Sequence, residues 1–246
     1  HLAECTRGLP PDRFDTHELS PVDETLPRVA YTCQVLFHLY YGEFIGRHPV
    51  LVHPNELMDG AVLNTHNTVA STRDATYVLQ NHPVVQELYD LHGKELDFAG
   101  VFAYRGQINS MDDKERSTDQ AVKTLRMMGV DGVVMTWTGA GNPGIDIMLL
   151  CQKCEQQGIK TSMINPEMGL IPDDTGFVHE VPEADAIVNA GNYEEMLTLP
   201  AVERVIGGPK LVEPNLEAAG ELEVPLRYLY GSTNIMGASK LAGIQY

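Results

Sequence analysis

The chain has 246 residues, of which 43% are hydrophobic and 21% charged, a composition typical of a globular protein that can bury a sizeable core. Its 34 acidic and 17 basic residues give a net charge of −17, which argues against nucleic acid or an anionic membrane as a partner. No apolar run approaches the roughly 18 residues of a membrane-spanning helix. The chain opens on His1 and not on Met, so we expect a processed product or a part of a longer polypeptide.

The first 27 residues differ in composition from the rest of the chain. Residues 1–27 contain four prolines and many acidic residues. This pattern predicts an extended arm or linker that lies over the body of the protein or over a neighbouring chain. The body, residues 28–246, begins with a β-rich run at 28–37 and a second apolar run at 49–54.

Regularly spaced start and stop signals of helices and strands from residue 81 onward predict the fold class. Residues 81–93 predict a helix that begins at Pro83 and stops at Gly93. We expect further helices at 117–129 and 142–158, capped by Ser117 and Asn142, and strands at 97–104, 130–137, 159–165, 184–190 and 202–208. This alternation across 97–208 predicts an α/β domain with a doubly wound, mostly parallel sheet and helices on both faces. The first four of these strands are expected to be neighbours.

One cysteine pair has the spacing of a metal or redox motif. Cys151 and Cys154 form a single CxxC, but a zinc ribbon needs a second pair, and a redox pair belongs at a helix start. The two thiols instead continue an apolar helical stripe that includes Ile147 and Leu150. We therefore expect buried, reduced, metal-free thiols in a cytoplasmic protein.

Two segments are candidates for a site at the carboxyl ends of the predicted strands, where parallel sheets usually bind ligands. The segment TGAGNPGID (138–146) leads from strand to helix, and its free N–H groups suit an anion or a carboxylate; the alternative is a tight turn without a ligand. The charged segment 109–119 is either a solvated loop or a rim that grips a polar partner or substrate. Trp137 either lines a binding site, where its ring makes a cation–π contact with a ligand, or packs in the core.

A third segment, 63–77, is unusually polar and contains no Gly or Pro. His66, Asn67, Thr68, Ser71 and Thr72 are crowded together there. A hydroxyl beside a histidine can act as a nucleophile, but a turn with local hydrogen bonds explains the same composition.

Several collinear stretches resemble the proprotein subunit of glycine/sarcosine/betaine reductase component B and the related D-proline reductase proprotein. The stretches are ELMDGA (56–61), NHPVVQELYDLHGK (81–94), DKERSTD (113–119), GVDG (129–132), GAGNPGIDIM (139–148), VIGG (205–208) and STNIMG (232–237). Together they span roughly residues 28–240 and make an unrelated α/β binding protein a poor explanation.

The resemblance implies a role in anaerobic amino-acid reductase complexes. In that family the proprotein is cut at a cysteine, which becomes a pyruvoyl group that captures the substrate amine. A selenocysteine or cysteine of a separate subunit then attacks the α-carbon, and the C–N bond breaks. The implied partners are this thiol- or selenol-bearing subunit, the N-terminal part of the proprotein or other copies of this chain, and a small amine or amino-acid substrate.

The cutting segment of the family, Asn-Cys-Val-x-x-Cys, falls on residues 67–72, where the sequence departs from it. Thr68 and Thr72 replace the two cysteines, and Ser71 is displaced from the matching position. Threonine would leave a ketobutyryl group, so we expect no pyruvoyl cofactor in this chain.

Two hypotheses follow from this resemblance. The chain is either a subunit of an oxidoreductase complex of the amino-acid reductase type or a non-catalytic, non-processed structural paralogue in such a complex. A pocket is expected where 63–77 meets 105–119 and 138–146. Its candidate catalytic residues are Thr68, Ser71, His66 and Asn67, and its candidate substrate-binding residues are Arg116, Asn142 and Gly141.

Overall fold

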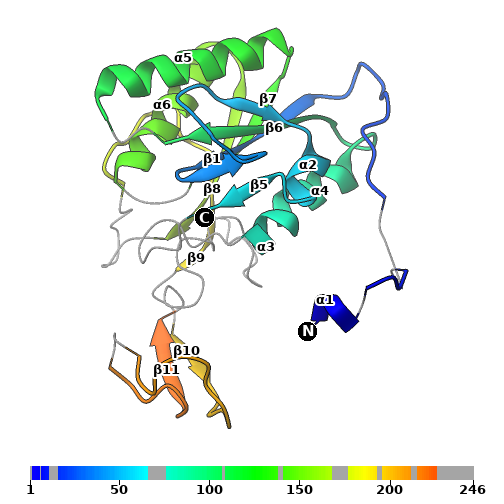
Figure 1. The fold of residues 1–246 in the computed structure, drawn as a ribbon. Helices are drawn as coiled ribbons and strands as arrows, with labels where there is room; N and C mark the ends of the chain where they lie inside the picture. Colours follow the sequence, from blue (N-terminus) through cyan, green and yellow to red (C-terminus); the bar gives the residue numbers. More distant parts are fainter. Residues whose placement is uncertain are drawn as a thin grey trace.

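The computed structural model describes residues 2–5, 7–10, 16–65, 76–106, 109–137, 141–167, 177–192, 196–211 and 215–225. In this part of the chain, a six-stranded sheet lies between helices, and two smaller sheets accompany it (Figure 1). The predicted α/β architecture with a mostly parallel sheet is confirmed. None of the helices in the described ranges is both long and apolar enough to cross a membrane.

The six-stranded sheet is built around β1 (Arg28–Val35), which is buried along most of its length. β1 pairs in parallel with β6 (Asp97–Arg105) along one edge and with β7 (Gly132–Thr136) along the other. The strand order is β4-β6-β1-β7-β8-β9, completed by β4 (Val50–Val52), β8 (Lys160–Glu167) and β9 (Ile187–Asn192). β4 is antiparallel to β6, and the other pairings are parallel.

The expected strand order is wrong at one point. The strands predicted at 97–104 and 130–137 are not neighbours, because β1 lies between β6 and β7. β1 is buried on both faces, and a strand of this kind needs a hydrogen-bonding partner along each edge. The strands predicted at 130–137, 159–165 and 184–190 are neighbours, as expected, and form β7, β8 and β9.

Helices cover both faces of the sheet (Figure 1). One face carries α5 (Met111–Met127) and α6 (Asn142–Gln156), and the other carries α4 (Pro83–Leu91) with the shorter α2 (Pro54–Met58) and α3 (Thr76–Gln80). Two side chains of β1 illustrate the alternation. Gln34 Nε2 donates to the Pro143 carbonyl at the start of α6 (2.8 Å), whereas Tyr31 Oη lies 2.8 Å from Nε2 of His82, the residue before α4.

The start of α5 differs from the prediction. The helix begins at Met111 because the side chain of Ser110 accepts a hydrogen bond from the backbone N–H of Asp113 (3.3 Å). Ser117, the expected cap, lies inside the helix and donates through Oγ to the carbonyl of Arg47 (2.6 Å). The predicted start of α4 at Pro83 is confirmed.

A three-stranded antiparallel sheet follows β1 in the chain. Its order is β3 (Glu43–Phe44), β2 (His38–Tyr40) and β5 (Val62–Asn64). Tyr41 and Gly42 join β2 to β3 with φ angles of 49° and 87°, and two successive positive φ angles are typical of a type I′ hairpin turn. The segment between β5 and α3 (Thr76–Gln80) lies largely outside the described residues.

Within the predicted arm, residues 16–27 contact the body of the same chain. Asn55 of α2 donates through Nδ2 to the carbonyl of His17 (3.0 Å), and His92 Nε2 lies 2.9 Å from the carbonyl of Ser20. A short helix, α1 (Leu2–Cys5), precedes it. Residues 16–27 therefore lie on the side of the sheet that carries α2 and α4, whereas Figure 1 shows α1 apart from the sheet.

The strand predicted at 202–208 is not formed. β10 (Met196–Leu199) instead pairs antiparallel with β11 (Leu222–Pro225) in a two-stranded ribbon. Of residues 202–208, Val205 is half-buried and the others are exposed, so the apolar run has no sheet to pack against. Sequence alternation thus identified an apolar stretch here but not its structure.

The packing of α5 gives a testable prediction. Leu125 is fully buried on the inner face of α5, whereas Met127, two residues later, is 80% exposed. Replacing Leu125 by Ala should lower the free energy of unfolding by about 2–5 kcal/mol, because the change removes buried methyl groups and leaves a cavity. The control Met127→Ala should change it by less than ~0.5 kcal/mol in urea unfolding. Equal effects of the two substitutions would contradict the packing described.

Candidate functional site

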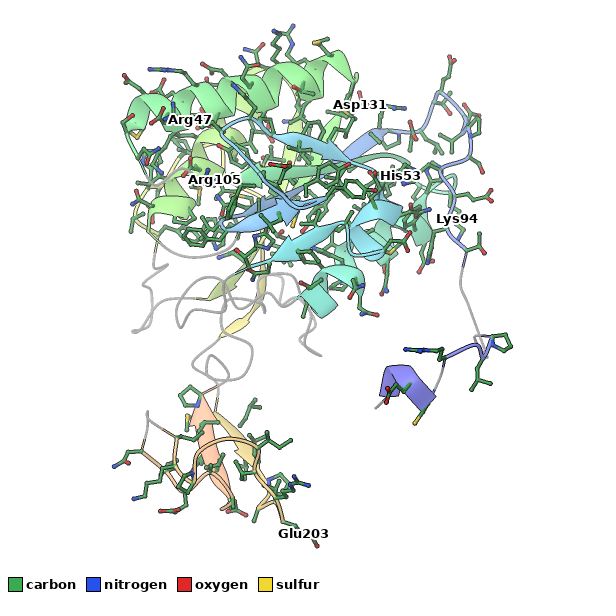
Figure 2. All side chains as sticks on the ribbon, in the orientation of Figure 1. Arg47, His53, Lys94, Arg105, Asp131 and Glu203 are labelled. Carbon is green, nitrogen blue, oxygen red and sulfur yellow. The ribbon has the colours of Figure 1, made fainter. Side chains whose placement is uncertain are left out.

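The carboxyl ends of β1, β6, β7 and β8 meet at one edge of the large sheet, which we call the carboxyl edge. Val35 at the end of β1 pairs with Arg105 at the end of β6, and Thr136 at the end of β7 pairs with Ile164. Both α5 and α6 begin there. Figure 2 shows Arg105 and Arg47 on this side of the molecule, whereas Asp131, which precedes β7, lies at the opposite end of the sheet.

The start of α6 has no side-chain cap, and there Asn142 is exposed whereas Gly144 is buried. Gly141 is its N-cap, one residue before the predicted cap Asn142, and its φ of 79° favours glycine. No side chain caps the helix, and its first turn contains no acidic residue. The first N–H groups of a helix have no intrahelical partner, so Asn142 and Gly144 offer donors at the positive end of the helix dipole, while Pro143 offers none.

The start of α5 lies at the same edge but is neutralised by its own side chains. Ser110 caps the helix, and Asp112 and Asp113 occupy its first turn. The guanidinium of Arg47 lies 2.9 Å from the carboxylate of Asp113. Partial burial works against ionisation of Asp113, but the hydrogen bond from Ser110 and the charge of Arg47 keep its pKa below the usual value. An anion would meet two carboxylates here, so α6 is the better binding end.

A buried ion pair fixes the first turn of α6 to α5. Lys114 Nζ lies 2.6 Å from Asp146 Oδ2 and donates to the carbonyl of Asn142 (3.0 Å). The side chains of Lys114 and Asp146 are only 3% and 0% exposed. A buried cation needs such partners to offset the loss of its hydration. The pair therefore sets where the uncapped start of α6 lies.

A second contact holds the same turn against the sheet. Gln34 of β1 donates through Nε2 to the carbonyl of Pro143 (2.8 Å). Gly106, directly after β6, lies so close that a Cβ added to it would be 3.0 Å from Leu36 Cδ2 and 3.4 Å from both Gln34 Nε2 and Pro143 Cβ. Glycine at 106 thus allows the close approach of β1, β6 and α6.

The opposite face of the sheet contains a buried polar network. Tyr31 Oη lies 2.8 Å from His82 Nε2 and 2.5 Å from Thr136 Oγ1. His82 is fully buried, and this burial lowers its pKa to about 3. The ring is therefore neutral at ordinary pH. The network links the start of α4 to the end of β7, and its three side chains are buried.

The predicted residues fall into three groups. Gly141 and Asn142 lie together at the start of α6. Arg116 lies on the exposed face of α5, where its guanidinium is 3.7 Å from the carboxylate of Asp112. It follows the buried Lys114 by two residues, so its side chain points to the opposite side of the helix. His66, Asn67, Thr68 and Ser71 lie outside the described residues, and their roles stay predictions.

Thr65, the last described residue before 66–75, lies close to the end of β1. Thr65 Oγ1 donates to the carbonyl of Phe37 (2.5 Å), and Phe37 comes two residues after the end of β1. The chain thus enters 66–75 from a position close to the carboxyl end of β1.

Trp137 and the cysteine pair have structural surroundings. Trp137 is buried, and its ring packs edge-on against that of Phe177, with 5.1 Å between the centroids, which confirms the core alternative. Cys151 and Cys154 are buried in α6 as predicted, and burial raises the pKa of the Cys154 thiol to about 12. The described part of the chain contains no group of three or more His, Cys, Asp or Glu residues arranged to hold a metal.

Sequence reasoning missed Lys114 and Asp146. The segment 109–119 is predicted to be either a solvated loop or a rim that grips a polar partner or substrate, and neither alternative buries its lysine. The available signal was Ser110, which as N-cap extends the helix and places Lys114 in line with Thr118 and Leu125 on the inner face.

Comparison with known proteins gives consistent matches. A family model described as "Glycine/sarcosine/betaine reductase component B subunits" matches residues 1–243. The whole chain aligns at 32% identity with the glycine reductase complex component B subunits alpha and beta of Acetoanaerobium sticklandii, covering 62% of that protein. It aligns equally, at 32% identity and 62% coverage, with the sarcosine reductase complex component B subunit alpha of Peptoclostridium acidaminophilum.

A betaine reductase complex component B subunit alpha of Peptoclostridium acidaminophilum is 29% identical over 84% of the chain and 50% of that relative. The chain therefore spans about six tenths of the length of the first two curated relatives. No solved structure gives a significant match.

The buried ion pair gives a second prediction. Lys114→Met should lower the free energy of unfolding by about 3–5 kcal/mol, because Asp146 loses its cation inside the protein. The double substitution Lys114→Met with Asp146→Leu should recover most of this loss, since apolar replacement of a whole buried pair is often neutral. Lys153→Met, which removes a partly exposed pair with Asp119 (2.6 Å), is the control and should cost at most ~1 kcal/mol in urea unfolding. A double variant as unstable as the single one would contradict this account.

The buried histidine gives a pH prediction. The pKa of His82 is 6.5 in the unfolded chain and about 3 in the folded chain, because burial disfavours the charged ring. Below pH 6.5 the unfolded chain therefore binds a proton at His82 that the folded chain does not bind. The free energy of unfolding should therefore fall as pH drops from 6.5 towards 5, with a slope that approaches about 1.4 kcal/mol per pH unit as the unfolded histidine becomes fully protonated. His82→Gln keeps a polar partner for Tyr31 but cannot titrate, so the pH slope should decrease by that amount. Identical slopes in wild type and variant would refute the assignment.

Proposed function

Because the chain belongs to the family of glycine/sarcosine/betaine reductase component B subunits, we propose that it is a subunit of an amino-acid reductase complex. The complex would break the C–N bond of a small amino acid or amine. A thiol or selenol of a partner subunit attacks the α-carbon, and the nitrogen leaves with the bonding electron pair and takes up a proton. The role of this chain is to bind the substrate and present its α-carbon to the partner.

The observation that carries this proposal is the uncapped start of α6 at the carboxyl edge. Its first turn has no capping side chain and no acidic residue, in contrast to the neutralised start of α5. The N–H groups of Asn142 and Gly144 suit the carboxylate that glycine, sarcosine and betaine share. These residues belong to the GAGNPGIDIM stretch on which the resemblance rests.

The predicted catalytic segment is proposed to complete this pocket. Thr65 lies beside Phe37, just beyond β1, so His66, Asn67, Thr68 and Ser71 begin from a point near the carboxyl edge. A substrate held by its carboxylate at α6 would then have its amine within reach of this polar segment. Arg116 is proposed as a contact for the partner subunit, because its guanidinium lies on the exposed face of α5.

The pyruvoyl group of the family does not fit Thr68. The threonine side chain carries a methyl group at Cβ, so cleavage and elimination there would give a ketobutyryl group. We therefore assign no step to a pyruvoyl in this chain.

A second candidate function follows from the same residue. Thr68 and Thr72 replace both cysteines of the cutting segment, which favours a non-processed paralogue that keeps the fold and the complex interface without catalysis. Substrate binding at α6 separates the two proposals, because a purely structural subunit has no need of it.

Substrate binding is tested by titrating the isotope-labelled chain with glycine, sarcosine and betaine and recording amide NMR spectra. At least one of them should shift the amide signals of Asn142 and Gly144. Asn142→Asp places a carboxylate at the helix start at almost constant volume and should weaken binding about tenfold or more, since it repels the carboxylate of the substrate. Asp112→Asn at the start of α5 is the matched control and should leave the affinity unchanged.

The same preparation tests the expected lack of processing. Its intact mass should be that of one unbroken chain, and a carbonyl-reactive hydrazide should not label it. Two fragments with a labelled new N-terminus would replace the non-processed account with the family's pyruvoyl chemistry. If none of the three compounds binds and the chain is intact, the structural alternative stands in place of the catalytic one.

A further inference from the structure

The two-stranded ribbon near the end of the described chain has almost no core of its own. Among residues 196–211 and 215–225, Val224 alone is buried. Met196, Val202, Ile206 and Leu216 are large apolar residues that are exposed, Ile206 by 93%. Figure 1 shows the ribbon of β10 and β11 standing apart from the six-stranded sheet.

An isolated ribbon of this kind is at best marginally stable in water. Two strands without a third strand or a helix cannot bury enough apolar surface to offset the entropy of ordering the chain. Exposed apolar side chains gathered in one small segment are also typical of an interaction surface. The ribbon therefore needs at least one further element against it.

The two outer edges of the ribbon differ in how well they are protected. On β11, Glu223 brings a charge to the strand, and Pro225 at its end cannot donate a hydrogen bond. These residues pair with Thr198 and Met196 of β10. The β10 sequence Met-Leu-Thr-Leu contains no charge, no proline and no glycine. The outer edge of β10 is thus protected only by its short length of four residues and by Pro200, which follows the strand, and it carries no charge against strand addition.

We propose that β10 pairs antiparallel with β10 of a second copy of this chain. The two ribbons then form one continuous four-stranded sheet about a two-fold axis, with the order β11-β10-β10-β11. Four strands with a shared apolar face meet the requirement that a single ribbon does not. A two-fold axis is the commonest symmetry of protein dimers.

Charge favours a second copy meeting at β10 over one meeting at β11. Two chains that each carry −17 repel one another over most of their surface, so contact is least opposed where the strand is neutral. Antiparallel pairing of β10 with itself brings no charged residues together. Pairing through β11 would bring the Glu223 side chains of the two copies close, and like charges across strands are destabilising.

The strand pairing alone is small, and the exposed apolar side chains enlarge the contact. A stable dimer usually buries about 1,200–2,000 Å² in total, more than four residues of strand per copy can supply. Met196 lies on β10 itself, while Val202, Ile206 and Leu216 lie in the loops around the ribbon and are available to the same contact. Dimer formation through β10 depends on neither the reaction nor the substrate of the proposed function.

Sedimentation velocity of the full chain tests the proposal. From ~1 to ~100 μM, the mass should rise from 27.1 kDa towards twice that value. The double substitution Met196→Lys with Thr198→Lys should raise the dimer dissociation constant at least about tenfold, because lysines of the two copies then face each other across the strand pair. Glu223→Lys, on the partner strand directly opposite Thr198, is the control and should not weaken the dimer.

A charge exchange distinguishes pairing at β10 from a general loss of structure. A variant with Met196→Glu and Thr198→Glu should also be monomeric alone, but mixed with the lysine variant it should form dimers. All variants should keep the circular dichroism spectrum of the wild type, since both positions are exposed. A wild-type chain that stays monomeric at ~100 μM, a lysine variant that dimerises as well as wild type, or a mixture that stays monomeric would each overturn the proposal.

Discussion

A lysine ammonium removed from water dictates the arrangement of the two helices that begin at the carboxyl edge. Lys114 reaches from the first turn of α5 to Asp146 and to the carbonyl of Asn142, both in α6. Gln34 holds the next carbonyl, that of Pro143, from the side of the sheet. Two successive carbonyls of α6 are thus fixed from two directions, and the N–H groups at the helix start keep a constant direction. The binding end assigned to α6 depends on these contacts more than on any residue of the glycine-rich turn itself.

The two helices that begin at the carboxyl edge differ in how their N-termini are satisfied. At the start of α5, Ser110 caps the helix and Asp113, which is paired with Arg47, offsets the positive end of the helix dipole, so no ligand is needed there. α6 has no such residues, and its partial positive charge remains available. In a chain of net charge −17, a free anion is repelled at long range, whereas a zwitterionic amino acid has no net charge. Under the proposed function, such a ligand suits a local positive end within an acidic protein.

Sequence patterns predicted the parts of the fold that depend on local periodicity. The fold class, the helix from Pro83 and the buried stripe through Cys151 and Cys154 follow from spacing and punctuation. The position of β1 between β6 and β7 does not, because strand order depends on pairings between residues about 70 and 100 positions apart. At the site, the glycine-rich turn predicts Gly141 and Asn142, but the charged segment 109–119 does not single out Lys114 as a buried residue. Its burial depends on α6, and no local pattern reports a partner 32 residues away.

The central position of β1 also has a consequence during synthesis. Among the described strands of the large sheet β1 comes first in the chain, yet its partners are residues 97–105 and 132–136. Until those residues emerge, an uncharged strand core, Val-Ala-Tyr-Thr-Cys-Gln-Val, is exposed with both edges open. Such a segment can pair with any other extended chain, and nascent chains that end before β7 are the most vulnerable to it. The strand that organises the finished sheet is therefore exposed to mispairing for as long as the chain is incomplete.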